Sequence, residues 1–339
     1  MLEHGGNLHE AVQRYGRPLS QWLDLSTGIN PQPYPSPILD QLVWHRLPET
    51  SSELVAAACA YYGAPDMLAV AGTQAAIQAL PQLRRQQAAD KLSRVVVAAP
   101  AYAEHAHRWQ QAGHAVREID YPHLAQAIDT CDVMVVCNPN NPTGAGVAPG
   151  VLLDWAARLA ARGGWLVVDE AFGDTLPLQS VAAHAEMAGL IVLRSVGKFF
   201  GLAGLRLGFV AANRILLDDL RDWLGPWAVS GPAQEIGLTA LRDSAWQQAT
   251  RERLLVDGSR LRQLLASCGI VSGGSALYQW WPQANAGAWH DYMAQQGIWV
   301  RLFTRGAGGI RLGLPPHETG WQRLERALHG WSASAGTAS

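Results

Sequence analysis

Short runs of consecutive apolar residues recur along the chain. Each run is six or seven residues long and rich in Val, Leu and Ile, which is typical of a strand buried on both faces. The stretch 151–162 instead spaces its apolar residues three and four positions apart, which predicts an amphipathic helix. We therefore predict strands over 94–99, 132–137, 164–169, 190–195 and 206–212.

The order of these segments predicts the fold class, α/β. Strands that alternate with helices form a mainly parallel sheet that helices cover on both faces. From about 231 the pattern changes to a long helical region ending at Cys268, strands near 276–281, 297–302 and 308–314, and helices near 286–296 and 317–330. We predict a large domain over 46–230, a smaller α+β domain from 1–45 and 231–330, and a disordered tail over 331–339.

Composition and charge narrow the classes of function. The chain has 339 residues, of which 48% are hydrophobic, so it can bury a large core. Its net charge of -2 favours neither a nucleic-acid partner nor a membrane surface. The sequence lacks an 18-residue apolar run, a signal-peptide core and a metal-binding cysteine spacing. We expect a cytoplasmic protein that binds a small molecule.

Polar residues follow three of the predicted strands. Ligands of open parallel sheets bind beyond the carboxyl ends of the strands. The segment "NPNNPTG" (138–144) follows the strand 132–137, Asp169 ends the strand 164–169, and Ser195 ends the strand 190–195. Any one of them is compatible with an ordinary loop or helix cap. The three together predict a site.

Lys198 is the second unusual feature of this region. The chain has two lysines and 24 arginines, so arginine supplies its ordinary positive charge. A lysine in apolar surroundings has a lowered pKa and becomes a nucleophilic amine that can form a Schiff base. The alternative is a surface lysine with a packed stem. Ser195 to Lys198 also match the S-x-x-K pattern of serine β-lactamases, but K-T-G is absent, as is a P-loop motif.

A phosphate site is predicted before the helix of the segment 70–80. Free N–H groups at a helix N-terminus bind phosphate, and here they follow Gly72, Thr73 and Gln74. Arg206 can add a bidentate contact and Ser195 a hydroxyl. A phosphate site, a carboxylate and a reactive lysine together suit pyridoxal phosphate, whose aldehyde needs the lysine and whose ring nitrogen needs the carboxylate.

Six motifs in order resemble the fold-type I, aspartate-aminotransferase-like enzymes that use pyridoxal phosphate. They are "AGTQ", "PAYAEH", "NPNNPTG", "VVDEAF", "SVGKFFGLAGLRLG" and "GGIRLGL". The resemblance implies the fold of these enzymes and a homodimer with its site at the subunit interface. It implies a Schiff base at Lys198, Asp169 at the ring nitrogen, Asn141 at the phenolic oxygen and Tyr102 stacked on the ring. The phosphate would be held by Gly72, Thr73, Gln74, Ser195 and Arg206.

Two branches of that family fit, the histidinol-phosphate aminotransferases and the threonine-phosphate decarboxylases of cobalamin (vitamin B12) biosynthesis. The segments "EHGGNLHEAVQRYG" and "WLDLSTGINPQPYP" resemble the opening of the decarboxylases. Phe172 in "DEAF" agrees, because many aminotransferases have Tyr there. The resemblance implies a lyase that converts L-threonine O-3-phosphate to (R)-1-aminopropan-2-yl phosphate and CO2. The substrate residues implied are His4, Gly5, Gly6, Asn30, Arg301 and Arg311, with Arg311 on the carboxylate.

Two alternatives stay open: an aminotransferase, and a pyridoxal-phosphate-binding protein without catalysis. The chain also departs from the family at Leu47, where related enzymes usually have a Tyr that reaches the partner subunit's cofactor phosphate. Either this contact is lost, or Arg46, Tyr61 or another group replaces the Tyr.

Overall fold

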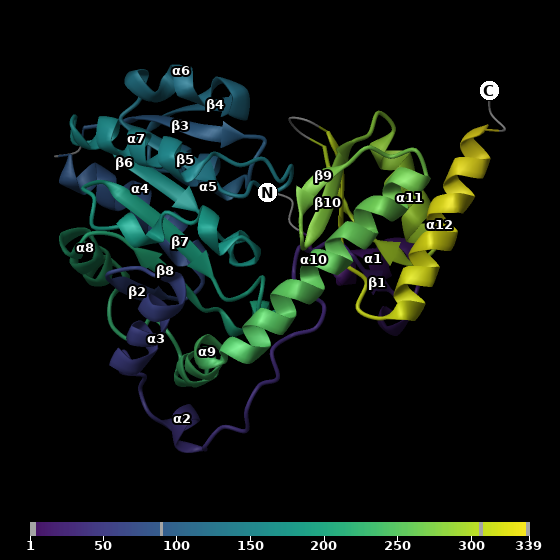
Figure 1. Ribbon diagram of the computed structural model, residues 1–339, viewed down its shortest axis with the longest axis horizontal. Coiled ribbons are helices and arrows are strands. Elements are labelled where there is room, and N and C mark those ends of the chain that lie inside the picture. The colour runs from purple at the N-terminus through teal and green to yellow at the C-terminus, as the bar shows by residue number, and fades with distance from the viewer. Residues whose placement is uncertain (1–4, 89–90, 305–307, 337–339) are drawn as a thin grey trace. The chain divides into compact units, whose positions relative to one another are not determined.

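The computed structural model describes residues 5–88, 91–304 and 308–336, with side chains up to Trp331. Figure 1 shows the chain as a ribbon coloured from its N-terminus to its C-terminus. Its contacts divide the chain into two compact units. The larger unit comprises 33–141 and 145–251, and the smaller one comprises 1–32, 142–144 and 252–339.

The larger unit is built on a seven-stranded sheet with the order β2-β8-β7-β6-β5-β3-β4. The five strands from β7 to β4 run parallel to one another, and β8 is antiparallel to both β7 and β2. This confirms the mainly parallel sheet. The bounds are β2 (Met67–Val70), β3 (Arg94–Ala99), β4 (Ala115–Asp120), β5 (Val133–Cys137), β6 (Trp165–Asp169), β7 (Leu190–Ser195) and β8 (Gly208–Ala211).

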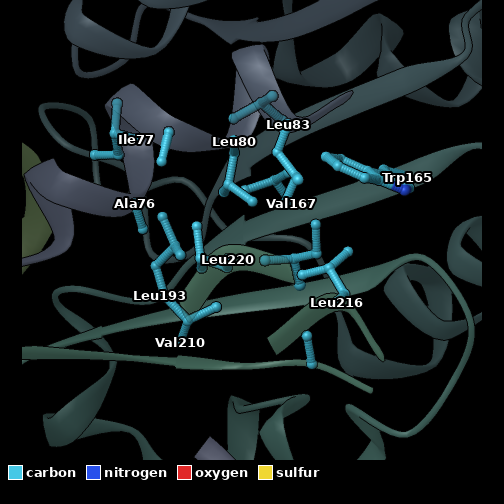
Figure 2. Packing of buried hydrophobic residues seen from close by; sticks show 14 of the residues in the cluster. Ala76, Ile77, Leu80, Leu83, Trp165, Val167, Leu193, Val210, Leu216 and Leu220 are labelled. Carbon is cyan, nitrogen blue, oxygen red and sulfur yellow. The ribbon is translucent and has the colours of Figure 1, made fainter. Parts of the chain in front are cut away.

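Helices pack on this sheet through their apolar faces. Figure 2 shows Leu80 and Leu83 of α4 near Leu216 and Leu220 of α8, above strands of the sheet. Each such buried side chain stabilises the fold by about 1.5–3 kcal/mol. The helices are α2 (Leu42–His45), α3 (Ser52–Tyr62), α4 (Thr73–Gln87), α5 (Glu104–Gln111), α6 (Leu124–Ala127), α7 (Pro149–Ala160), α8 (Arg214–Leu224) and α9 (Gly231–Arg242).

The smaller unit combines both ends of the chain. Strand β1 (Leu23–Asp24) pairs in parallel with β11 (Ile298–Trp299). A second, antiparallel sheet has the order β12-β13-β10-β9, with bounds β9 (Gly273–Ser275), β10 (Tyr278–Pro282), β12 (Arg301–Phe303) and β13 (Gly309–Gly313). The helices are α1 (Leu8–Tyr15), α10 (Ser244–Ser267), which begins in the larger unit, α11 (Ala286–Gln295) and α12 (Glu318–Gly336).

The unit boundaries differ from 46 and 230. The segment from 33 belongs to the larger unit because the Tyr34 amide donates to the Phe200 carbonyl (2.8 Å). The later boundary falls inside α10, between Arg251 and Glu252, because α9 packs on α3. Residues 142–144 join the smaller unit, where a Cβ on Gly144 would lie 2.1 Å from the Gly274 carbonyl oxygen.

The C-terminal helix also differs from its predicted end at 330. Helix α12 continues to Gly336, so most of the segment predicted as a disordered tail is helical, because alanine and serine are compatible with a helix. Residues 337–339 lie outside the described part of the chain. Among the described residues, each helix is too short or too polar to cross a bilayer.

Candidate functional site

One cavity in the larger unit gathers the residues predicted to bind a cofactor. It opens at the carboxyl ends of the parallel strands, as expected for this kind of sheet. Cys137 and Phe172 also line it. The nine predicted residues that line this cavity are Gly72, Thr73, Gln74, Tyr102, Asn141, Asp169, Ser195, Lys198 and Arg206.

One end of the cavity is suited to an anion. Helix α4 begins at Thr73, and its N-cap residue Gly72 has no side chain to satisfy the first N–H groups. A Cβ on Gly72 would lie 2.7 Å from a guanidinium nitrogen of Arg206, so only glycine permits this approach. Arg206 itself has φ 55, a left-handed conformation that is rare for a residue with a side chain. Ser195, at the end of β7, lines the same cavity.

The Asp169 carboxylate is held from two directions. One oxygen accepts the Ala171 amide (3.0 Å), and the other lies 2.8 Å from Nε2 of the buried His105. Burial disfavours the charged ring, but the Cys137 sulfur and the Asp169 carboxylate outweigh burial and raise the pKa of His105. An Asp169 carboxylate held in this way by His105 and the Ala171 amide is placed to hold a proton on a ring nitrogen.

Lys198 lies three residues after β7, in a turn that is mostly buried. Its Nζ is 5.5 Å from the centre of the Phe172 ring. Phe172 stands at the position where many of the aminotransferases that this sequence resembles have a Tyr. Asn141 ends the larger unit's first segment and lines the same cavity.

Two arginines face each other in the smaller unit. Arg301 on β12 and Arg311 on β13 are direct cross-strand partners, and both guanidinium groups lie near the Phe303 ring, at 5.2 and 6.0 Å. Burial lowers the pKa of Arg311 to about 10, and the charge of Arg301 contributes to the lowering. Like charges in this position repel each other, so a bound anion would stabilise the pair.

The other predicted substrate residues lie in the same unit. The Gly6 amide donates to Oγ of Ser26 (2.8 Å), and a Cβ on Gly5 would lie 2.5 Å from the Ser26 carbonyl oxygen. Nη2 of Arg311 donates to that same carbonyl oxygen (2.8 Å). Gly5, Gly6 and Arg311 thus meet around Ser26. His4 lies outside the described residues.

Asn30 is buried, and its side-chain oxygen accepts two hydrogen bonds. The donors are the Gln32 amide (3.0 Å) and Nη2 of Arg253 (3.0 Å). The predicted substrate residues belong to the smaller unit and the predicted cofactor residues to the larger one. Tyr61, a possible replacement for the family Tyr at Leu47, donates its hydroxyl to Asp174 (2.9 Å).

His105 and Arg253 were not among the site residues predicted from the sequence. The "PAYAEH" motif contained His105, and a histidine three residues after a ring-stacking Tyr was a usable signal. Arg253 lies on α10 among many arginines, and the sequence does not show that it reaches Asn30, 223 positions earlier.

The cavity fits pyridoxal phosphate by its donor set. A helix N-terminus with an arginine suits the phosphate, a carboxylate held by a histidine suits the ring nitrogen, and a single lysine suits the aldehyde. The lysine, the carboxylate, the arginine and the start of α4 all line the cavity described above.

Comparisons with known proteins agree with this arrangement. The sequence model of the family "Aminotransferase class I and II" matches residues 28–319. A threonine-phosphate decarboxylase of Pseudomonas aeruginosa is 53% identical, with 99% of each chain covered. A threonine-phosphate decarboxylase of a Sinorhizobium species is 42% identical over 96% of this chain and 97% of the relative.

A solved structure shows the same fold. The histidinol-phosphate aminotransferase of Clostridium acetobutylicum superposes with a TM-score of 0.79 at 19% identity, covering 92% of this chain and 99% of its own. Because the family match extends over most of the chain and the cavity carries the cofactor's donor set, the chain belongs to the aminotransferase class I and II family of pyridoxal-phosphate-dependent enzymes.

Proposed function

We propose that the chain decarboxylates L-threonine O-3-phosphate to (R)-1-aminopropan-2-yl phosphate and CO2, a reaction of cobalamin biosynthesis. The observation that carries the proposal is the identity of 53% and 42%, over nearly the whole chain, to two relatives named threonine-phosphate decarboxylase. The paired Arg301 and Arg311 support it, because this substrate carries two anionic groups, a carboxylate and a phosphate.

We assign each cofactor contact to a residue of the cavity. Lys198 would hold the aldehyde carbon covalently, Asp169 would keep a proton on the ring nitrogen, and Asn141 would donate to the phenolic oxygen. Tyr102 would stack on the ring. The N-terminus of α4, with Ser195 and Arg206, would hold the phosphate. When bound, pyridoxal phosphate supplies an electron sink for the bond that breaks at Cα of the substrate.

The substrate groups decide which bond breaks. Arg311 would bind the substrate carboxylate through a bidentate pair, and Arg301 would bind the phosphate. From the resemblance, His4 and Asn30 are further candidates for substrate contacts. A decarboxylase must orient the bond between Cα and the carboxylate for cleavage, so the direction from which Arg311 would bind the carboxylate matters most. Lys198 Nζ, or a nearby water, would return a proton to Cα.

One assay tests the reaction. The purified protein is incubated with pyridoxal phosphate and L-threonine O-3-phosphate, and CO2 and aminopropanol phosphate are measured. We expect both products in equal amounts. Amino transfer from glutamate to imidazole-acetol phosphate without CO2 release would support the aminotransferase alternative instead, in which Lys198 removes the Cα proton. Cofactor binding with neither activity would support a non-catalytic binding protein.

We also propose a cytoplasmic homodimer. All four cysteines are free thiols, which suits a reducing compartment. Large apolar side chains between 38 and 47 are exposed, and a cluster of this kind on a monomer suits a subunit contact. They are Ile38, Leu42, Trp44 and Leu47. Light scattering after size exclusion should give twice the chain mass, and Trp44→Glu should shift the protein toward the monomer.

A further inference from the structure

Glu104 is a buried carboxylate that the proposed chemistry does not use. It is the first residue of α5, in the "PAYAEH" motif, and it is 6% exposed. Its Oε2 accepts hydrogen bonds from Nε2 of Gln74 (2.6 Å) and from Nε of Arg108 (2.8 Å). A buried glutamate needs partners of this kind, and one of them is a residue that lines the cofactor cavity.

The carboxylate fixes which way the Gln74 amide faces. An ionised carboxylate only accepts hydrogen bonds, so the NH2 end of Gln74 must face Glu104. The carbonyl end, Oε1, then faces Tyr102, whose hydroxyl donates to it at 3.2 Å. A flipped amide would place its carbonyl oxygen against the carboxylate and its NH2 group against the tyrosine. The chain of contacts therefore runs in one direction, from Tyr102 through Gln74 to Glu104.

Tyr102 must keep its hydroxyl proton to donate this hydrogen bond to Gln74. Burial raises the pKa of Tyr102 to about 12, and the charges of Glu104 and Asp169 contribute to the rise. The hydroxyl therefore stays protonated near neutral pH and can donate a hydrogen bond. The Gln74 side chain is occupied by its hydrogen bonds to Glu104 and Tyr102. Gln74 can therefore contribute only its backbone N–H to the anion site at the N-terminus of α4.

We propose that Glu104 is a positioning residue for the cofactor: through Gln74 it holds the Tyr102 ring in the orientation that stacks on the pyridine ring. The inference rests on the proposed cofactor and not on the proposed substrate. The Arg108 contact has a different role. Arg108 lies four residues later on the same helix and is 26% exposed, so its ion pair with Glu104 supports the helix and would persist without Gln74.

A double-mutant cycle tests the proposal on pyridoxal phosphate binding, without substrate. The variants are Glu104→Gln, Tyr102→Phe and the double variant, and the measurements are the dissociation constant and the visible circular dichroism of the bound cofactor. In Glu104→Gln the neutral amide no longer forces the Gln74 orientation. We expect the dissociation constant to rise about two- to tenfold, the factor of one net hydrogen bond, and the dichroism to change. In the Tyr102→Phe background, which keeps the ring and lacks the hydroxyl, Glu104→Gln should have no further effect.

Arg108→Met is the matched control. It removes the ion pair of Glu104 and keeps its bond to Gln74, so the dichroism should stay as in the unmodified chain. Additive effects of Glu104→Gln and Tyr102→Phe, or an Arg108→Met variant that reproduces the Glu104→Gln change, would overturn the proposal. If Glu104→Gln does not fold, Gln74→Met takes its place in the cycle with the same expected result. Absence of binding by the unmodified chain would reject the cofactor itself, and absence of decarboxylation alone would leave this test intact.

Discussion

Arg194 and Glu170 form a buried ion pair that joins the ends of β7 and β6. Their side chains are 3% and 1% exposed. Arg194 directly precedes Ser195, and Glu170 directly follows Asp169, so the pair ties together the two strand ends that carry cofactor residues. A Cβ on Gly173 would lie 2.8 Å from Nη1 of Arg194, so only glycine leaves room for the guanidinium group there.

Breaking this pair should be costly. Arg194→Met leaves the buried Glu170 side chain without its ion-pair partner, and we expect a loss of about 3–5 kcal/mol in the free energy of unfolding. Arg242→Met is the control, because its pair with Glu53 is exposed (56% and 67%) and should contribute less than about 1 kcal/mol. Urea denaturation of the cofactor-free protein measures both. If both variants lose the same unfolding free energy, burial does not make the Arg194–Glu170 pair more important than an exposed pair.

The two lysines of the chain provide a direct test of Lys198. Lys198→Ala should abolish the visible absorption that appears when a lysine amine bonds to the cofactor aldehyde. The matched control is Lys91→Ala, which removes the exposed lysine and should keep the spectrum. If the absorption persists in Lys198→Ala and disappears in Lys91→Ala, the assignment of Lys198 is wrong.

His105 should make stability depend on pH. Its folded pKa is raised to about 10, above the ordinary value of 6.5, because Cys137 and Asp169 outweigh the effect of burial. The stabilisation is therefore fully present below about pH 6.5 and is lost as the pH rises toward 10. The gap in unfolding free energy between the unmodified chain and His105→Asn should narrow from pH 7 to pH 9.5. His114→Asn is the control, because burial lowers the pKa of His114. The difference in unfolding free energy between His114→Asn and the unmodified chain should therefore stay constant from pH 7 to pH 9.5.

Gly72 and Gly63 separate backbone strain from loss of the anion site. Both have positive φ, +71 and +68, so alanine strains the backbone at either position. Only at Gly72 does a Cβ meet Arg206; at Gly63 nothing lies within 4 Å. Gly72→Ala should weaken pyridoxal phosphate binding by tenfold or more, about the effect of losing a charge-assisted contact, whereas Gly63→Ala should lower stability alone. Equal cofactor affinities in the two variants would argue against the phosphate assignment.

The substrate arginines should differ from other arginines of the smaller unit. Arg301→Met should raise the KM for L-threonine O-3-phosphate by about ten- to a hundredfold, because a hydrogen-bonded charge is lost at the phosphate. Arg262→Met, on the exposed side of α10, should leave KM unchanged. If Arg301→Met and the unmodified chain have the same KM, the substrate phosphate is bound by another residue and the assignment to Arg301 is wrong.

Central strands were predictable from the sequence, and edge strands were not. The strand over 94–99 matches β3 residue for residue, since it is buried on both faces and reads as one apolar run. Strand β4, "AVREID", lies at the sheet edge and is mostly exposed, so its sequence has no such run. The two-residue strand β1 is too short to leave a pattern.

The candidate site divides in a similar way. Residues at the carboxyl ends of strands, such as Asp169 and Lys198, could be located because the topology brings strand ends together. The contacts of Glu104 with Gln74 and of Arg253 with Asn30 depend on side-chain reach across elements. No local pattern encodes that reach, and these contacts were found only in the structure.

The pairing of β1 with β11 has a consequence for how the chain is made. Once translation has passed Arg251 and this part of the chain has left the ribosome, all residues of the larger unit are present and its sheet can form. Leu23 still lacks its partner Ile298 at that moment. Strand β1 can pair only after almost the whole chain has been made, so we expect the smaller unit to form last and to set the time at which the new protein is fully folded.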